Sequence, residues 1–77
     1  TILIYGLNSS ESLDGDAFAD LLYGNDGDDT ITGNNGDDQI FGGAGADSLV
    51  GGEGSDLLQG NTGNDVQRGG NGNDFIF

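Results

Sequence analysis

A period of nine residues governs the sequence from Gly24 to Phe77. This stretch divides, without insertions, into six units: GNDGDDTIT, GNNGDDQIF, GGAGADSLV, GGEGSDLLQ, GNTGNDVQR and GGNGNDFIF. Every unit has Gly at position 1, Gly or Asn at position 2, Gly at position 4 and Asp at position 6. A short, fixed period of this kind predicts a solenoid, in which each repeat adds one structural unit to a stack.

The same frame extends toward the N-terminus with looser agreement. The unit that starts at residue 15, GDAFADLLY, keeps Asp20 at position 6 but has Phe18 at position 4. The unit before it, GLNSSESLD, has Ser9 at position 4 and Glu11 at position 6. Terminal repeats of solenoids are usually atypical because they cap the stack, so we interpret both units as degenerate repeats.

These units predict how the chain is organised. They fill residues 6–77, which are 72 residues, or 8 × 9. We expect a single domain over residues 1–77, with degenerate repeats at 6–23 and regular repeats at 24–77. The first five residues, TILIY, alternate well enough for a strand and would place Ile4 and Tyr5 at positions 8 and 9 of a partial unit.

Each position of the repeat has a local role. Gly, and next best Asn, tolerates the positive φ of a tight turn, so positions 1 to 6 are expected to turn the chain. Positions 7 to 9 then form a short strand, in which position 8 points to one face and positions 7 and 9 to the other. Position 8 holds seven aliphatic residues among eight and is the predicted core: Leu13, Leu22, Ile31, Ile40, Leu49, Leu58, Gln67 and Ile76. Gln67 interrupts this row, and we expect Val66 to replace it after a small shift of register.

The composition excludes several classes of function. The net charge is −13 with Arg68 as the single basic residue, which disfavours nucleic acid and anionic lipid as partners. No apolar run approaches the length of a membrane span, so membrane insertion is not expected. Without His, Lys or Cys, general acid–base catalysis would fall to carboxylates, and we expect no enzymatic activity. The strict register argues against a permanently disordered linker, although disorder is the expected state without a bound cation.

A row of aliphatic side chains is a small core for a chain with 17 glycines and 14 acidic residues. Something must therefore bind the folded form and neutralise its carboxylates. Calcium suits this role, because it takes about six to eight carboxylate and carbonyl oxygens in loose geometry. The absence of His and Cys disfavours zinc and copper, and magnesium requires a tighter octahedron.

The tandem G-[G/N]-x-G-x-D units resemble the RTX, or haemolysin-type calcium-binding, repeat family. The resemblance implies an all-β fold, a right-handed parallel β-roll (a β-solenoid) with two nonapeptides per coil, and calcium ions held between the turns of successive coils. It also implies that position 6 supplies a carboxylate and that positions 2 and 4 supply carbonyls. The implied metal ligands are Asp20, Asn25, Gly27, Asp29, Asn34, Gly36, Asp38, Gly43, Gly45, Asp47, Gly52, Gly54, Asp56, Asn61, Gly63, Asp65, Gly70, Gly72 and Asp74.

In that arrangement, units two apart stack on each other. Asp29, Asp47 and Asp65 would line one edge, and Asp38, Asp56 and Asp74 the other. Two gaps on each edge give 2 + 2, or four, calcium ions, and Asp20 with Asp38 adds a further site. A site of Glu11 with Asp29 is left open, because the first unit lacks both turn glycines. Three other acidic residues, Asp26, Asp28 and Asp37, are interpreted as solvated turn charges.

Odd and even units then contribute to opposite sheets with different outer faces. Outward positions of the odd units are mostly polar, whereas those of the even units include Leu21, Tyr23, Phe41, Leu57, Phe75 and Phe77. Such an apolar face favours an interface, although β-propensity alone could place aromatic residues there. An ice-binding array is not expected, since the outward Thr and Asn residues are scattered.

Two functions remain open. The first is a calcium-binding structural module of a secreted or cell-surface bacterial protein, disordered at low calcium and folded outside the cell, as the resemblance implies. The second is a self-assembling subunit of an extracellular fibre or surface layer, a homo-oligomer built by end-to-end stacking and by the apolar face.

Overall fold

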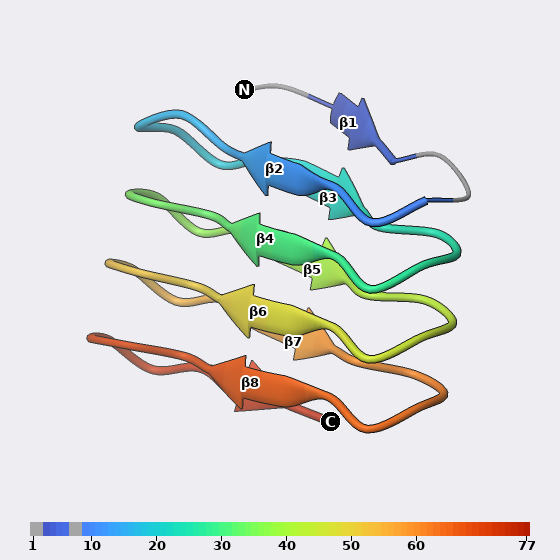
Figure 1. Cartoon of the computed structure of the whole chain (residues 1–77). Coiled ribbons are helices and arrows are strands. Elements are labelled where there is room, and N and C mark those ends of the chain that lie inside the picture. The colour runs from blue at the N-terminus through green and yellow to red at the C-terminus, as the bar shows by residue number, and fades with distance from the viewer. Residues whose placement is uncertain (1–2, 7–8) are drawn as a thin grey trace.

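The chain folds into a flattened solenoid of short strands, described here from a computed structural model (Figure 1). The structure describes residues 3–6 and 9–77, so Thr1 and Ile2 of the expected first strand lie outside it. Every regular element in these ranges is a strand, as the nine-residue pattern predicts. The strands are β1 (Leu3–Tyr5), β2 (Ser12–Asp14), β3 (Leu21–Tyr23), β4 (Thr30–Thr32), β5 (Gln39–Phe41), β6 (Ser48–Val50), β7 (Leu57–Gln59), β8 (Val66–Arg68) and β9 (Phe75–Ile76).

Alternate strands form two parallel sheets that face each other. One sheet has the order β1-β3-β5-β7-β9 and the other β2-β4-β6-β8. Each strand pairs with the strand one coil later, as Ile31 does with Leu49 and Ile40 with Leu58. One coil therefore contains two nonapeptides, and the all-β solenoid prediction is confirmed. In Figure 1 the front strands run leftward and the rear strands rightward as the chain descends, which makes the coil right-handed.

The core is the single row of position 8 side chains between the two sheets. Its five fully buried members are Leu22, Ile31, Ile40, Leu49 and Leu58. Ile4 of β1 and Leu13 of β2 pack against this row and are partly buried. Alternation along strands of only three residues is enough to sort the chain, because one residue points inward and its two neighbours point outward.

The expected replacement of Gln67 by Val66 is wrong. Gln67 stays in register opposite Leu49, whereas the Val66 side chain is 57% exposed. The Gln67 Nε2 donates a hydrogen bond of 2.8 Å to the Phe77 carbonyl, and its Oε1 is buried without a partner. Register holds because shifting one strand by a residue would turn its inward side chain outward and unpair its ladder hydrogen bonds.

The turns form two rows, one at each long edge of the solenoid (Figure 1). The Asn residues at position 2 have positive φ, for example 65° at Asn25 and 69° at Asn34, in agreement with the expected turn chemistry. Backbone hydrogen bonds between coils continue past the strand ends into the turns. Gly24 donates to the Phe41 carbonyl and Thr30 to the Glu11 carbonyl, both at 2.8 Å. Successive turns are therefore held in a fixed stack.

The outer face of the β1-β3-β5-β7-β9 sheet has apolar side chains, as expected from the even units. Tyr5, Tyr23 and Phe41 form a stack with ring centroids 5.0 Å apart at each step. Phe75 and Phe77 are 66% and 68% exposed. No helix in the described part of the chain is long and apolar enough to span a membrane.

Candidate metal centre

The position 6 aspartates lie in two rows, one along each row of turns. Five of these side chains are buried, and the two in the last coil are half-buried: Asp20, Asp29, Asp38, Asp47 and Asp56, then Asp65 and Asp74. Buried carboxylates are rare unless they are paired with a cation or fully hydrogen-bonded. The environment of each oxygen therefore decides what these rows can do.

In the six position 6 aspartates that follow Asp20, the Oδ1 atom accepts a hydrogen bond from the coil that precedes it. Asp38 Oδ1 accepts a hydrogen bond from the Asp20 N–H at 2.9 Å, and Asp47 Oδ1 accepts one from the Asp29 N–H at 2.9 Å. The same bond recurs with Asp29, Asp56, Asp65 and Asp74 as acceptors. Each carboxylate thus bridges the gap between its own turn and the equivalent turn 18 residues earlier.

The Oδ2 atoms are different, because four of them are buried without a hydrogen-bond partner: those of Asp29, Asp38, Asp47 and Asp56. An ionised oxygen in this state has lost its hydrogen bonds to water, and no hydrogen bond within the protein replaces them. A repeated, oriented and unsatisfied carboxylate oxygen is the feature that a bound cation would satisfy.

Burial changes the acidity of these groups in the direction that this environment dictates. Desolvation raises the pKa of Asp38 to about 7 and that of Asp47 to about 6, each from an ordinary 3.8. It also raises the pKa of Asp29 and Asp56. Backbone N–H donors lower these pKa values, and neighbouring carboxylates one coil away raise them further. The metal-free turns therefore hold charge that the fold itself does not stabilise.

Carbonyl oxygens of the turns point into the same gaps. A Cβ placed on Gly24 would lie 2.6 Å from both Asp29 Oδ2 and the carbonyl oxygen of Gly42, one coil later. A Cβ on Gly70 would lie 2.5 Å from the carbonyl oxygen of Gly52, one coil earlier. Equivalent contacts direct the carbonyls of Asn25, Asn34, Gly27, Gly36, Gly45 and Gly54 toward the next coil. The turns need glycine here partly because a side chain would fill the space among these oxygens.

The structure therefore brings the predicted ligand types together but does so in small sets. Among the described residues, no three acidic side chains converge on one point. Each gap instead combines the carboxylates of two successive turns with backbone carbonyls. This donor set is all oxygen, and it suits calcium better than zinc, which prefers thiolate and imidazole.

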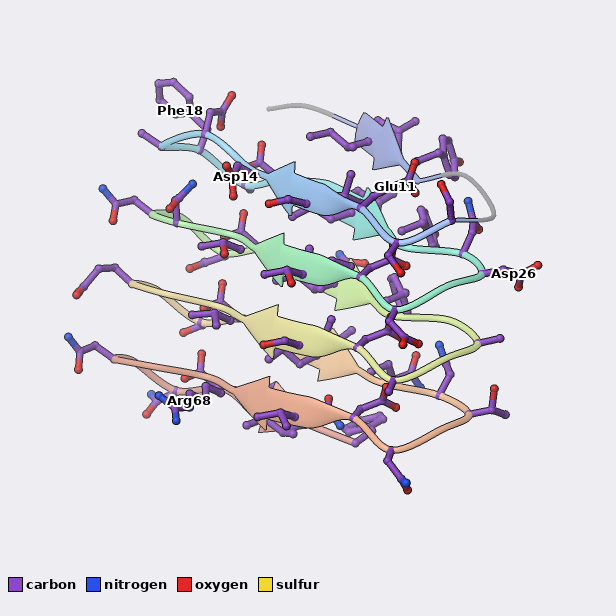
Figure 2. All side chains as sticks on the ribbon, viewed as in Figure 1. Glu11, Asp14, Phe18, Asp26 and Arg68 are labelled. Atoms are coloured by element: carbon purple, nitrogen blue, oxygen red, sulfur yellow. The ribbon has the colours of Figure 1, made fainter. Side chains whose placement is uncertain are left out.

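The degenerate second unit keeps this arrangement despite its unusual sequence. Phe18 points out from the tip of its turn (Figure 2), and the side chain is 66% exposed. The carbonyl of Phe18 faces Gly36, where a Cβ would lie 2.7 Å from the oxygen, as the glycine carbonyls do elsewhere. Asp20 Oδ2 accepts a hydrogen bond of 2.8 Å from the Asp16 N–H. The bulky residue at position 4 is accommodated because its side chain leaves the stack.

The outer turn carboxylates are exposed, in line with their interpretation as solvated charges, and Asp26 points outward from its turn (Figure 2). Two of them also form bonds that the sequence did not reveal. Asp28 Oδ1 accepts the Ala46 N–H, and Asp37 Oδ1 accepts the Ser55 N–H, both at 2.8 Å. Asp28 and Asp37 occupy position 5 of adjacent units. The sequence signal that could have predicted these bonds is an acidic residue at position 5 followed, 18 residues later, by a small residue at the same position.

A right-handed parallel solenoid whose stacked turns align buried carboxylates with carbonyl oxygens defines a class, the cation-binding repeat proteins. The sequence profile described as the RTX calcium-binding nonapeptide repeat matches residues 5–40, 14–49 and 41–76. The chain belongs to this family, whose repeats bind calcium, and the resemblance noted from the sequence is confirmed. No curated protein and no solved structure matches the chain significantly.

Proposed function

We propose that residues 1–77 act as one calcium-binding structural module that folds when its turns bind calcium. The family identity and the solenoid both fit a calcium-binding structural role. The observation that supports the folding switch is the set of buried Oδ2 atoms without partners, for example in Asp38 and Asp47. Calcium would convert these unfavourable charges into ligands, so that binding free energy becomes folding free energy.

The proposed ligands are the position 6 carboxylates together with the carbonyls of positions 2 and 4. The Asp29–Asp47–Asp65 and Asp38–Asp56–Asp74 rows each enclose two gaps, which would hold four ions. The gap that follows Asp20 would hold one more, because the Asp38 carboxylate reaches across it. The carbonyl donors would be Asn25, Gly27, Asn34, Gly36, Gly43, Gly45, Gly52, Gly54, Asn61, Gly63, Gly70 and Gly72.

The same chemistry would make folding depend on location. At submicromolar calcium the carboxylates would repel one another and keep the chain disordered, whereas millimolar calcium outside a cell would fill sites of modest affinity. A secreted or cell-surface bacterial protein would benefit from this difference, because the module would cross the envelope unfolded. RTX repeat proteins are typically secreted, which supports this part of the proposal.

Circular dichroism during a calcium titration tests the proposal. We expect a cooperative gain of β signal with calcium, a much weaker response to equal concentrations of magnesium, and loss of the signal on adding a chelator. Magnesium is the matched control because it has the same charge but demands a tighter shell. A chelated sample that retained its full β signal and melting temperature would contradict the folding switch.

A second function, assembly into a calcium-stabilised extracellular fibre or surface layer, is favoured by one observation. The outward side chains of the described β1-β3-β5-β7-β9 sheet include no charged residue, although the chain has a net charge of −13. Copies could therefore meet through Leu21, Tyr23, Phe41, Leu57, Phe75 and Phe77, and could also stack coil on coil. Sedimentation velocity with and without calcium tests this: calcium-dependent large species would support assembly, and a monodisperse monomer at both conditions would exclude it.

A further inference from the structure

We infer that Asn35 is a site of spontaneous deamidation in the folded chain, and that Glu53 protects the equivalent residue, Asn71, from the same modification. Two asparagines of the sequence are followed directly by glycine, in the pairs Asn35–Gly36 and Asn71–Gly72. Asparagine in such a pair is especially reactive, because glycine has no Cβ to hinder attack of its backbone nitrogen on the asparagine side chain. The two pairs occupy the same positions of their repeats, so the contacts around them decide which one reacts.

The modification needs water and no other reagent. The Gly36 backbone nitrogen loses its proton and attacks Cγ of Asn35, so that a C–N bond forms, the Cγ–Nδ2 bond breaks, and the amide nitrogen leaves as ammonia with that proton. The product is a five-membered cyclic imide. Water then opens the ring at one of its two carbonyls, which gives either aspartate or isoaspartate at this position. Nothing is oxidised or reduced in either step.

The turn around Asn35 leaves both reacting groups available. The Asn35 side chain is exposed, and its amide forms no hydrogen bond with any residue that the structure describes. The Gly36 N–H also donates no hydrogen bond within the described ranges. The residue one coil earlier is Ala17, whose methyl group offers no acceptor to the asparagine. Neither the electrophile nor the nucleophile must therefore leave a partner before they react.

Asn71 is held by the preceding coil instead. Its Nδ2 donates a hydrogen bond of 2.8 Å to Oε1 of Glu53, which lies 18 residues earlier. An ionised acceptor makes such a bond stronger than one between neutral groups. Attack by the Gly72 nitrogen requires the side chain to turn toward its own backbone, which breaks this bond. The bond also leaves more electron density on the amide nitrogen, so Cγ is a poorer electrophile. Both effects slow the reaction at Asn71.

Isoaspartate at position 35 would disturb the stack, because it routes the main chain through the former side chain and adds one carbon to it. The turn has no space for a longer backbone. A Cβ on Gly36 would lie 2.5 Å from the carbonyl carbon of Phe18 in the preceding coil, and a Cβ on Gly54 in the following coil would meet the Gly36 carbonyl oxygen. The turn is thus enclosed on both sides, and deamidation of Asn35 is a lesion that accumulates as the folded protein ages.

Mass spectrometry of peptides from the whole chain, aged in mildly alkaline buffer with saturating calcium, tests the inference. Deamidation raises the peptide mass, and chromatography separates the isoaspartyl form from the aspartyl form. We expect Asn35 to react severalfold faster than Asn71 in the folded chain. In concentrated urea the contact with Glu53 is lost, and the two rates should become similar.

Two variants isolate the contribution of Glu53. Glu53→Ala removes the acceptor, whereas the matched control Glu53→Gln loses the same charge but keeps an oxygen that can accept the bond. Glu53→Ala should raise the rate at Asn71 nearly to that at Asn35, and Glu53→Gln should retain most of the protection. Both should leave the rate at Asn35 nearly unchanged. Circular dichroism checks that both variants are folded, as expected for an exposed position.

The remaining outcomes separate this inference from the proposed function. Equal rates at Asn35 and Asn71 in the folded chain, or a rate at Asn71 that Glu53→Ala does not change, would overturn the protection. Deamidation of Asn35 in urea but not in the folded chain would overturn the reactive site. If chelation changed neither the β signal nor the unequal rates, the proposed calcium-dependent folding would fail and this inference would be supported.

Discussion

The row of aliphatic side chains at position 8 and the two rows of aspartates at position 6 are built alike but differ in what they require. Both are buried, and both repeat at intervals of 18 residues along the same stack. In the aliphatic row, each side chain is satisfied by the like side chain above and below it. In the aspartate rows, repetition brings like charges together, and one carboxylate oxygen is left buried without a partner in four residues: Asp29, Asp38, Asp47 and Asp56.

The two kinds of row therefore have different effects: the aliphatic row determines which fold forms, and the aspartate rows determine whether that fold is stable. The aliphatic row and the backbone ladder define the register, because any slip would expose the core. The aspartate rows add little favourable free energy alone, since a buried charge without a partner is destabilising. If folding depends on calcium as proposed, the chain encodes one structure unambiguously and still needs a cation to reach it.

The largest expected effect comes from removing the aspartate charge without any metal. In chelator, acidification from pH 8 to about 4.5 should induce β structure. The pKa of Asp38 is raised to about 7 and that of Asp47 to about 6 in the coil, against 3.8 when unfolded. The coil thus binds protons more tightly than the unfolded chain, so this stability is complete below about pH 3.8 and is lost as pH rises through 6 to 7. Asp38 alone would contribute on the order of 4 kcal/mol.

Added salt distinguishes protonation of the buried aspartates from a general decrease in repulsion among the acidic side chains of the surface. Molar sodium chloride at pH 8 screens exposed charges but leaves buried carboxylates unpaired. We therefore expect acid, and not salt, to restore the circular dichroism spectrum in chelator. An equal response to salt would show that the buried aspartates are not the dominant obstacle. With calcium present the direction reverses, because protons compete with the metal for the same oxygens.

The second prediction breaks the aliphatic row. Leu49→Ala removes a fully buried side chain between the two sheets and should cost about 2–5 kcal/mol of unfolding free energy. The loss should be similar in saturating calcium and in calcium-free samples folded with an osmolyte, since the core needs no cation. Chemical unfolding provides both values. Val50→Ala, at the half-buried outward neighbour, is the control and should cost clearly less.

The third prediction is that a substitution in the aspartate rows changes the unfolding free energy in opposite directions with and without calcium. Asp47→Asn keeps an acceptor for the Asp29 N–H but removes a buried charge. In saturating calcium the variant should lose at least about 1.4 kcal/mol, equivalent to a tenfold rise in the calcium midpoint. In calcium-free osmolyte it should be more stable than the wild type. Asp26→Asn, at an exposed position, should change neither value appreciably; destabilisation of Asp47→Asn in both conditions would remove the contrast with Leu49.

Much of this arrangement follows from the sequence, because a nine-residue repeat fixes strands, turns and core together. Positions 7 to 9 become strands in every unit, although β9 ends at Ile76, and alternate units fall on opposite sheets. The sequence could not show how the first unit is used. Glu11 and Ser9 break the repeat pattern, and only coordinates reveal that a longer side chain and an unchanged carbonyl reach the usual places. Similarly, the bonds of Asp28 and Asp37 join position 5 residues that are 18 apart in the sequence, a pairing that has meaning only once the two-unit coil is known.

The smallest expected effect concerns Gln67, the one residue of the aliphatic row that has a buried polar atom without a partner, as the aspartate rows do. Gln67 lies in the core row opposite Leu49, and its Oε1 is buried without a partner, as the aspartate Oδ2 atoms are. Calcium does not resolve this case, since the amide is neutral and Gln67 belongs to strand β8 and not to a turn. Gln67→Leu should therefore stabilise the coil by about 1 kcal/mol in calcium, because burial of the aliphatic group and removal of the unsatisfied oxygen outweigh the lost bond to Phe77.

The control for this change is Gln59→Leu, which replaces the same residue type at an outward position of β7. It adds apolar surface without correcting an unsatisfied group, so its unfolding free energy should stay within about 0.5 kcal/mol of the wild type. Equal stabilisation by both variants would mean that added hydrophobicity, and not the core row, accounts for the gain.

If Gln67→Leu were destabilising, the hydrogen bond to the Phe77 carbonyl would be worth more than the continuity of the row. The last coil would then rely on polar contacts as the turns do, and the contrast between core and turns would hold only for the coils that precede it.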